Sequence, residues 1–549
     1  MKILLLSILL INFGFMQSHW CGADKIKLNP KPIKLKQVKK NSNSNLKTNA
    51  DSYRPLTIGY DFSTLQKPSS MSSSTFNNIK TKLKEVGQEF SKFLQFQHVD
   101  INLYGLKDEI MKMCELNVIG QDYGNFLLRN DIIIFPEFDS TLSSSTIAAA
   151  GACLISEGDF QPFGGVLYIN PNINFNLRNV DYYMKNILLH EITHVLVFSP
   201  YIFENLHLNR TINGMSYIIS KNVVTQAQKH FDCNSLIGVP LEDQGGTGSA
   251  GAHWESRYML GDYMVSTDFP DSAISDITLA LFEDSGFYKV NYYSGGLFKF
   301  GKGAGCRFFN DKCVLNDEAQ FKDFCDVSSK PLCSSSRVLK SSCFMGRYPS
   351  IPPKYAYFSD KNIGGYSNAN YCPLAYETHP DNDYFPKHCQ FGSESSNYGE
   401  KLGPNSFCFM SSIVDGSSND SDDKPVCYEI ECDRSNKKII VKIGSSSVEC
   451  PNGGGSVNAP SGMKGTIDCP EYSDLCSSND IVCNDMYSCF TKIAENEKYN
   501  YDTSPYNYEG PTYTGDTKDE YIEPIRRSES FNLRMNLLLI AAICLFSLI

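Results

Sequence analysis

The sequence lacks any large cluster of lysine and arginine, and its 549 residues carry a formal net charge of -11. Without a basic surface the chain cannot match the phosphates of a nucleic acid, so nucleic-acid partners are excluded. No internal repeat is evident, which argues against a repeat architecture. The first apolar run ends near Met16 and is too short to span a bilayer, so it is not a membrane anchor.

The two ends of the chain have the composition of targeting segments. Residues 1–18 begin with Met-Lys, continue as an apolar run and end in small and polar residues, which predicts a secretory signal peptide. Residues 535–549 are apolar to the last position, as in a glycosylphosphatidylinositol (GPI) attachment signal. Ser528 and Gly515 are candidate attachment residues. A tail anchor and an unprocessed secreted chain are the alternatives.

The cysteine content indicates an oxidised, disulfide-bonded protein. Twenty cysteines follow a signal peptide, and with Cys544 in the removable tail and Cys21 free, eighteen remain for nine bridges. Most of them lie after Cys306, so the C-terminal third depends on disulfides, whereas the first half relies on a hydrophobic core.

Hydrophobic periodicity predicts an α+β fold of two or three packed units. Beyond residue 306 the periodicity gives way to loops rich in Cys, Ser, Gly and Pro, and residues 496–527 form an acidic, Tyr-rich stalk. The expected strands are 54–62, 130–138 and 164–173, and the expected helices are 73–95, 181–198 and 274–288. The helix 181–198 is expected to be capped by Asp181 and stopped by Pro200.

The stretch "NILLHEITHVLVF", residues 186–198, places three polar side chains in an apolar helix. His190 and His194 are four positions apart, so both imidazoles lie on one helix face and can reach a single ion, with Glu191 beside them. A catalytic zinc takes three protein ligands and a water, whose proton a glutamate can accept. The structural alternative is a set of hydrogen-bonded residues in a core.

A third zinc ligand must come from further along the chain. The compact metzincin spacing would place a histidine at position 200, which is Pro200 here. The downstream candidates are His207, His230 and His253.

The segment "GTGSAGAHWESRYMLGDYM", residues 246–264, resembles the leishmanolysin family, in which a long insertion separates the helix histidines from an Ala-His-Trp-Glu segment. A methionine eleven residues after that histidine matches the Met-turn of the family. The segments "LALFEDSGFYKV", "GAGCRFFNDKC" and "YRPLTIGYDF" are also similar to the family, and the resemblance covers about residues 19–490.

The resemblance implies a role for each matching residue. His190, His194 and His253 would be the ligands of one zinc ion, Glu191 the general base, and Met264 the apolar floor under the metal. His207 and His230 are then expected to be surface or loop residues.

Two positions depart from the family pattern. Val197 replaces a glycine that lets the chain leave the helix, so we expect the helix to continue for part of a turn and the path to His253 to shift. In the propeptide, "HWCGAD" keeps Cys21 but has Ala23 in place of a histidine. Cys21 alone could ligate zinc and keep the enzyme latent; the alternative is a disulfide-bonded Cys21.

Two further expectations concern the surface. In zinc proteases of this kind an extended substrate adds to a sheet edge, and the backbone of "GGVLYINP", residues 164–171, is the candidate. Asn209 and Asn419 begin glycosylation sequons.

Together these features predict a zinc-dependent endopeptidase that acts on proteins or peptides. We expect it to be secreted as a latent precursor to the cell surface or the extracellular space, and to be held to the membrane by a C-terminal lipid anchor. The alternatives are a surface adhesion or binding protein with an impaired site and a cysteine-rich coat protein. The fold expectation is a metzincin-like catalytic unit, a central Met-turn unit and a disulfide-rich, loop-dominated C-terminal unit. The expected segments are 1–18 (signal peptide), 19–52 (propeptide), 53–199 (catalytic unit with the zinc helix), 200–300 (third histidine and Met-turn), 301–495 (Cys-rich domain), 496–534 (stalk) and 535–549 (tail).

Overall fold

A computed structural model describes most of the chain between residues 53 and 476. The described ranges are 32, 36–37, 53–97, 101–102, 106–117, 130–143, 146–173, 180–244, 250–267, 272–292, 298–326, 331–375, 388–390, 399–417 and 422–476. The predicted signal peptide, stalk and tail, together with Cys21 and Asn419, lie outside these ranges. Within them, every helix is too short or too polar to cross a membrane.

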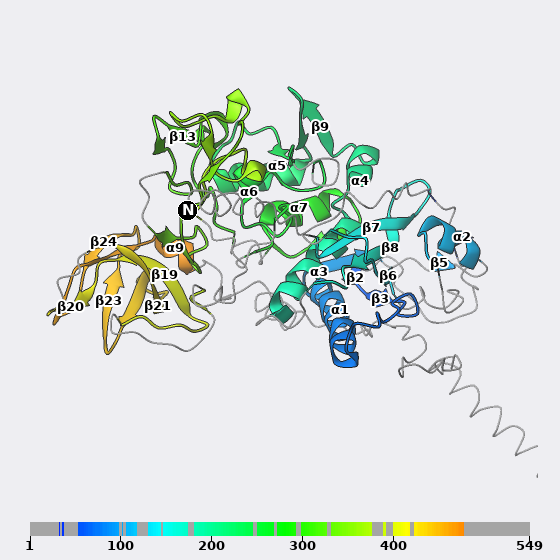
Figure 1. Ribbon diagram of the computed structural model, residues 1–549, viewed down its shortest axis with the longest axis horizontal. Helices are drawn as coiled ribbons and strands as arrows, with labels where there is room; N and C mark the ends of the chain where they lie inside the picture. The colour runs from blue at the N-terminus through cyan, green and yellow to red at the C-terminus, as the bar shows by residue number, and fades with distance from the viewer. Residues whose placement is uncertain are drawn as a thin grey trace, which may run out of the picture.

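A four-stranded sheet forms the frame of the N-terminal part (Figure 1). Its order is β3-β6-β8-β7, with β7 antiparallel to β8 and the other pairs parallel. The apolar stretches of the sequence form these strands because both faces of the sheet are covered. The strands are β3 (Ile58–Tyr60), β6 (Ile132–Phe138), β7 (Ala148–Ile155) and β8 (Pro162–Ile169).

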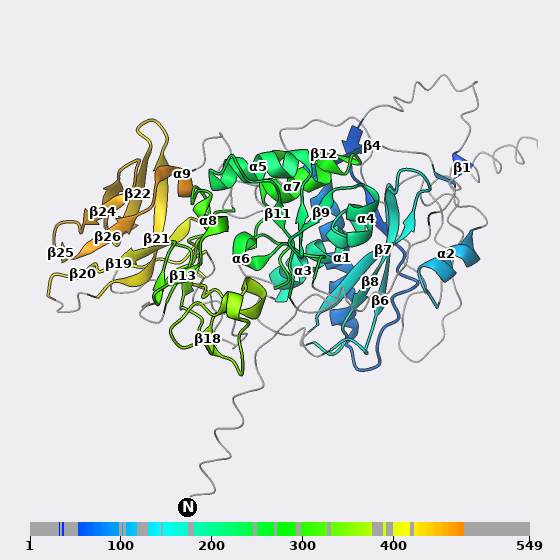
Figure 2. The same cartoon turned by 90° about the horizontal axis from the view of Figure 1, so that it is seen from above.

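Two long helices cover one face of this sheet. Helix α1 (Ser73–Phe93) begins at Ser72, whose hydroxyl accepts a hydrogen bond from the Thr75 amide, and packs beside α3 (Val180–Leu196) (Figures 1 and 2). On the other face, α2 (Lys107–Met113) contributes Ile110 to a smaller cluster and is joined to β7 by the Cys114–Cys153 disulfide. The helix predicted from Asp181 to Phe198 is α3, starting and ending slightly earlier.

Gly165 allows α3 to approach β8 closely. A Cβ at this position would lie 2.5 Å from Val195 Cγ1 and 2.7 Å from the Gly151 carbonyl oxygen. Val195 follows the second helix histidine directly, so this contact sets the distance between the histidine-bearing helix and the sheet. Gly165 therefore serves the packing of α3 on the sheet, whereas a Cβ on Gly164 would meet Ile133 and Leu154 on the opposite face.

The central part of the chain connects helix α3 to the C-terminal part. Helices α5 (Lys221–Phe231) and α7 (Asp276–Asp284) pack on each other, and α7 begins at Ser275, whose hydroxyl accepts from the Thr278 amide. The helix predicted over 274–288 is thus shorter than expected. This part also contains the short helices α4 (Pro200–Asn205) and α6 (Ser256–Met259). One three-stranded sheet consists of β9 (Asn209–Ile212), β10 (Met215–Ile218) and β11 (Val239–Pro240). A second consists of β2 (Tyr53–Pro55), β4 (Leu94–Gln97) and β12 (Tyr288–Val290).

The C-terminal part is only partly as expected. Residues 298–375 contain short elements linked by disulfides such as Cys313–Cys372 and Cys325–Cys343. These elements are α8 (Arg307–Asn310), the hairpins β13 (Val314–Leu315) with β14 (Glu318–Ala319) and β15 (Leu332–Cys333) with β16 (Lys340–Ser341), the pair β17 (Gly346–Arg347) and β18 (Ile363–Gly364), and the 3-10 turns Pro353–Tyr355 and Ser367–Ala369.

Residues 406–469 form a six-stranded antiparallel sheet, so the expectation of a loop-dominated C-terminal unit is wrong for this region. The sheet has its own hydrophobic core and lies at the opposite end of the molecule from the N-terminal sheet (Figures 1 and 2). Its order is β23 (Ser446–Cys450), β22 (Lys438–Ile443), β21 (Lys424–Asp433), β19 (Ser406–Ser411), β26 (Thr466–Cys469), β24 (Gly455–Asn458); β20 (Val414–Asp415) pairs with β25 (Met463–Lys464), and α9 (Tyr472–Leu475) follows.

Eight disulfides join cysteines of the described residues. Six of them lie wholly beyond Cys306, in agreement with the expected reliance of this part on disulfides. Cys333–Cys408 joins the hairpin region to the C-terminal sheet. The ninth expected bridge would use Cys483 and Cys489, which lie outside the described residues.

We expect Gly165→Ala to destabilise the protein by about 1–3 kcal/mol, because the new methyl group would meet both a side chain of α3 and a backbone carbonyl. Urea denaturation followed by circular dichroism measures this change. Gly453→Ala is the matched control, since nothing lies within 4 Å of a Cβ at position 453. Equal destabilisation by both substitutions would contradict the packing role of Gly165.

Candidate metal centre

Three histidines from two distant parts of the chain converge in the centre of the molecule. His190 and His194 lie on α3, and His253 lies in the segment that follows β11. The Nε2 atom of His190 is 3.1 Å from Nε2 of His194 and 3.2 Å from Nε2 of His253. All three side chains are buried.

The spacing of these nitrogens fits a single zinc ion. Ligand atoms about 2.0–2.1 Å from a tetrahedral zinc are about 3.3–3.4 Å apart, close to the separations seen here. Three neutral imidazoles form a ligand set that zinc accepts, and a fourth position stays available in such a site. The residues present therefore fit the metal that the sequence predicts.

Backbone carbonyls orient two of the rings. His190 Nδ1 donates to the carbonyl of Tyr263 at 2.5 Å, and His194 Nδ1 donates to the carbonyl of Phe198 at 2.8 Å. These bonds place the proton on Nδ1 and leave the Nε2 lone pair directed at the shared point. Burial lowers the pKa of His190 to about 3, with a contribution from the neighbouring His194, and lowers the pKa of His194 to about 4. Both rings are neutral at physiological pH, as metal ligands must be.

Val197 does not deflect the chain. Helix α3 ends at Leu196, the Val197 amide still donates to the Thr193 carbonyl, and the Phe198 amide donates to the same oxygen. The turn is made without a positive φ at residue 197. The helix thus extends by the part of a turn expected for a β-branched residue, but His253 still reaches the other two histidines. The expected shift of its path relative to the family stays a prediction.

The segment around Met264 is held by Asp262. The carboxylate of Asp262 accepts hydrogen bonds from the Met264 amide (2.8 Å), the Ser275 amide (3.0 Å) and the Thr278 hydroxyl (2.7 Å). The same Thr278 oxygen accepts from the indole of Trp254 at 2.8 Å. Desolvation nevertheless raises the pKa of Asp262 to about 6. Met264 is fully buried, and its carbonyl accepts from the Trp254 amide at 3.0 Å, next to the third histidine.

Tyr263 links the Met264 segment to α3 at two points. Its carbonyl binds the ring of His190, and its hydroxyl lies 2.8 Å from the hydroxyl of Thr193. Sequence reasoning missed Asp262, Tyr263, Thr193 and Thr278. No motif or spacing in the sequence marks them, and only their proximity in the fold shows their part in the site.

The remaining candidate residues lie at different distances from the centre. Glu191 is on α3 and fully buried. His207 is exposed, as expected. His230 was expected on the surface or in a loop, but it lies on helix α5, stacks on Phe298 and bonds the carbonyl of Phe300. Asn209 begins β9 and is partly exposed.

The segment expected to receive a substrate strand cannot do so. Residues 164–169 belong to β8, which is paired with β6 on one side and β7 on the other. The outer strands of this sheet, among the described strands, are β3 and β7, and α3 packs against β7. Sequence reasoning did not identify β7, because its run of alanines lacks the large β-branched residues that mark a strand.

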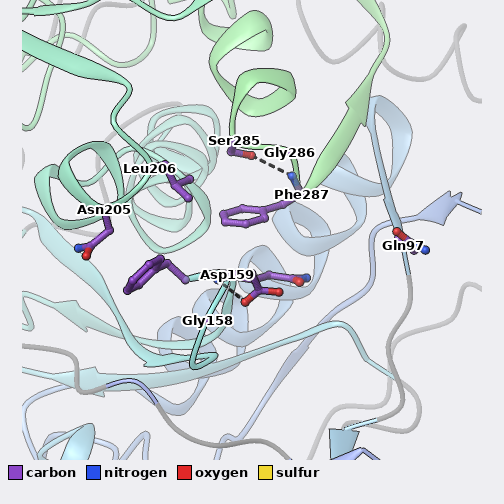
Figure 3. A pocket seen from close by; sticks show the side chains of 10 residues that line it. Gln97, Gly158, Asp159, Asn205, Leu206, Ser285, Gly286 and Phe287 are labelled. Atoms are coloured by element: carbon purple, nitrogen blue, oxygen red, sulfur yellow. Dashed lines mark hydrogen bonds between the residues drawn. The ribbon is translucent and has the colours of Figure 1, made fainter.

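A cavity of about 550 Å³ lies beside these elements and is separate from the histidines, none of which lines it (Figure 3). Phe160 and Phe287 contribute its apolar surface, and Asp159 and Gln97 contribute polar groups. It is formed by the connection between β7 and β8, the end of α4 and the turn after α7.

We expect Asp262→Ala to destabilise the fold by about 3 kcal/mol, because it leaves two buried amides and a buried hydroxyl without their acceptor. Equilibrium urea unfolding gives the value. Asp360→Ala serves as the control: it removes an exposed ion pair with Arg347 and should cost less than about 1 kcal/mol. The assignment fails if the Asp262 variant is as stable as the control.

Comparison with known proteins identifies relatives of this chain. A sequence model described as leishmanolysin matches residues 94–482. The leishmanolysin homolog of Crithidia fasciculata is 28% identical over 362 residues, which is 61% of this chain and 54% of that protein. Leishmanolysin of Leishmania major is 29% identical over 58% of this chain and 56% of its own length. The leishmanolysin-like peptidase of Drosophila melanogaster is 29% identical over 50% and 45%. The chain thus spans about half the length of these relatives.

Proposed function

The chain belongs to the leishmanolysin peptidase family, and from this premise we propose that it is a zinc-dependent endopeptidase that hydrolyses protein or peptide substrates. The observation that carries the proposal is the convergence of three Nε2 atoms, two of them on rings oriented by backbone carbonyls. His190, His194 and His253 would hold one zinc ion. A purely structural site would have no need of Glu191 beside the ligands.

The chemistry of the metal is that of a Lewis acid, which polarises a peptide carbonyl and makes water more acidic. Glu191 acts as the general base: its buried carboxylate accepts a proton from the attacking water and passes it to the leaving amine. The low dielectric of the buried site strengthens these charge interactions. Met264 would form the apolar floor of the metal site, and its backbone is held by Asp262 and by Trp254.

The substrate would bind as an added strand on β7. This strand is antiparallel to its neighbour β8 and forms one of the two outer edges of the described sheet. Unlike β3 at the other edge, it packs against the helix that carries Glu191. An extended peptide paired with β7 would satisfy backbone hydrogen-bonding groups on both chains and pass close to α3. The proposal thus moves the substrate edge from residues 164–171 to Ala148–Ile155.

The biological setting completes the proposal. The chain would enter the secretory pathway through residues 1–18, stay latent while Cys21 ligates the zinc, and remain at the cell surface through a lipid anchor added before the apolar tail, with glycans on Asn209 and Asn419. The apolar ends and the position of Cys21 support this sequence of events.

We expect the full-length Cys21→Ala precursor to cleave gelatin without processing, whereas the wild-type precursor should be inactive until a thiol-modifying reagent is added. The reason is that a thiolate occupying the fourth zinc position excludes the water needed for hydrolysis. Zymography of the two precursors measures this difference. Equal activity of both untreated precursors would argue against latency through Cys21.

In the Cys21→Ala background, Glu191→Ala should lower the rate of casein cleavage by about 10²–10⁴-fold, because the proton acceptor is lost, while zinc content by elemental analysis stays at one per chain. A chelator should abolish the activity of the Cys21→Ala protein, and added zinc should restore it. His207→Ala, at an exposed histidine outside the centre, is the matched control and should cleave normally. Cleavage that survives both Glu191→Ala and the chelator would refute the hydrolytic mechanism.

A further inference from the structure

A second group of potential metal ligands lies next to the third histidine and consists only of carboxylates. Glu242, Asp243 and Glu255 each place a carboxylate oxygen within 4.8 Å of the other two. Glu255 is fully buried, Glu242 is 2% exposed, and the side chain of Asp243 is 22% exposed. The histidine centre and its proposed chemistry make no use of these three residues.

The buried oxygens of this cluster have few protein partners. Glu255 Oε1 accepts from the Arg257 amide at 3.1 Å and so caps α6, but Glu255 Oε2 is buried without a hydrogen-bond partner among the described residues. Glu242 Oε1 accepts from the Gln244 amide at 2.8 Å, whereas Glu242 Oε2 has only a long contact of 3.4 Å with the Ser266 hydroxyl.

Protein cations balance the buried charge only in part. Lys354 Nζ lies 3.7 Å from Asp243, but its side chain is 65% exposed, and it pairs with the outer member of the cluster. The guanidinium of Arg257 attracts Glu255 electrostatically, but it bonds the carbonyls of Phe308 and Asp311 and forms no ion pair with Glu255. Within the described part of the chain, no ion pair reaches Glu242 or Glu255. Two buried carboxylates this close together are costly unless a positive charge or a proton lies between them.

We propose that Glu242, Asp243 and Glu255 bind a calcium ion. The site offers only oxygen atoms, which calcium prefers, and supplies the negative charge that tightens calcium binding. The Ser266 hydroxyl, next to Glu242, and the Tyr355 hydroxyl, 3.2 Å from Asp243 Oδ2, add oxygens at the edge of the same site. The unpartnered Glu255 Oε2 is the atom that most requires such a ligand.

The site would brace the segment that carries the third histidine. The Glu242 amide donates to the carbonyl of His253 at 2.9 Å, and the Gly251 amide donates to the carbonyl of Glu242 at 2.8 Å. Glu255 follows His253 by two residues on the other side. A calcium ion shared by Glu242 and Glu255 therefore joins the chain before and after His253 and limits the motion of that ring. This role goes beyond hydrolysis and does not depend on it.

The test uses the full-length chain with zinc bound, freed of calcium by dialysis against a chelator selective for calcium. Isothermal titration with calcium chloride should show one calcium per chain, and calcium should raise the melting temperature, because a ligand that binds only the folded state stabilises it. Glu255→Gln and Glu242→Gln should weaken calcium binding by about tenfold or more, since each removes a charged ligand. Glu85→Gln, on α1 and far from the cluster in the sequence, is the control and should bind calcium as the wild type does.

The wild-type titration needs no variant, so a variant that fails to fold leaves the proposal testable. No calcium heat and no shift in melting temperature for the wild-type chain would overturn it. Unchanged calcium affinity in both glutamine variants would also overturn it, because the ion would then bind elsewhere. A wild-type chain that binds no calcium but is stabilised by Glu255→Gln would indicate that a shared proton balances the pair. None of these readouts measures peptide cleavage, so their failure is distinct from a failure of the proposed activity.

Discussion

The hydrogen bond from His190 Nδ1 to the carbonyl of Tyr263 is the contact on which the metal centre depends. It joins α3, which rests on the N-terminal sheet, to the Met264 segment, which rests on α7 through Asp262 and Thr278. The carbonyl orients the ring, and the same backbone turn places the Met264 carbonyl against the Trp254 amide, beside His253. Two histidines from a helix and a third from a distant segment of the same hydrophobic core are thus held together by main-chain atoms, whose positions substitutions alter little.

Part of this arrangement was predictable from the sequence because its signals are local. The spacing of His190 and His194 indicates a shared helix face, and the apolar residues around them indicate burial. The choice of His253 among three downstream histidines needed the family resemblance, because a long insertion removes any spacing rule. The polar network of Asp262, Tyr263 and Thr278 could not be predicted, since each bond forms between residues that only the tertiary fold brings together.

The two errors in the fold have different physical causes. Residues 164–169 were expected at a sheet edge, but an edge is a property of strand order, which no single strand encodes. The C-terminal sheet was missed because Cys, Ser and Gly in the surrounding turns dominated the composition. A run of β-branched residues was nevertheless present in "KIIVKI", residues 438–443, and it is the signal that could have located the sheet.

Trp254 gives the third-histidine segment a spectroscopic property. The chain has two tryptophans, and the other, Trp20, precedes the predicted mature start. The indole of Trp254 is fully buried, packs edge-on against Phe198 with ring centroids 5.0 Å apart, and is covalently adjacent to His253. In a chain that lacks residues 19–52, all tryptophan fluorescence would arise beside the candidate metal centre, so its emission spectrum would report directly on that segment.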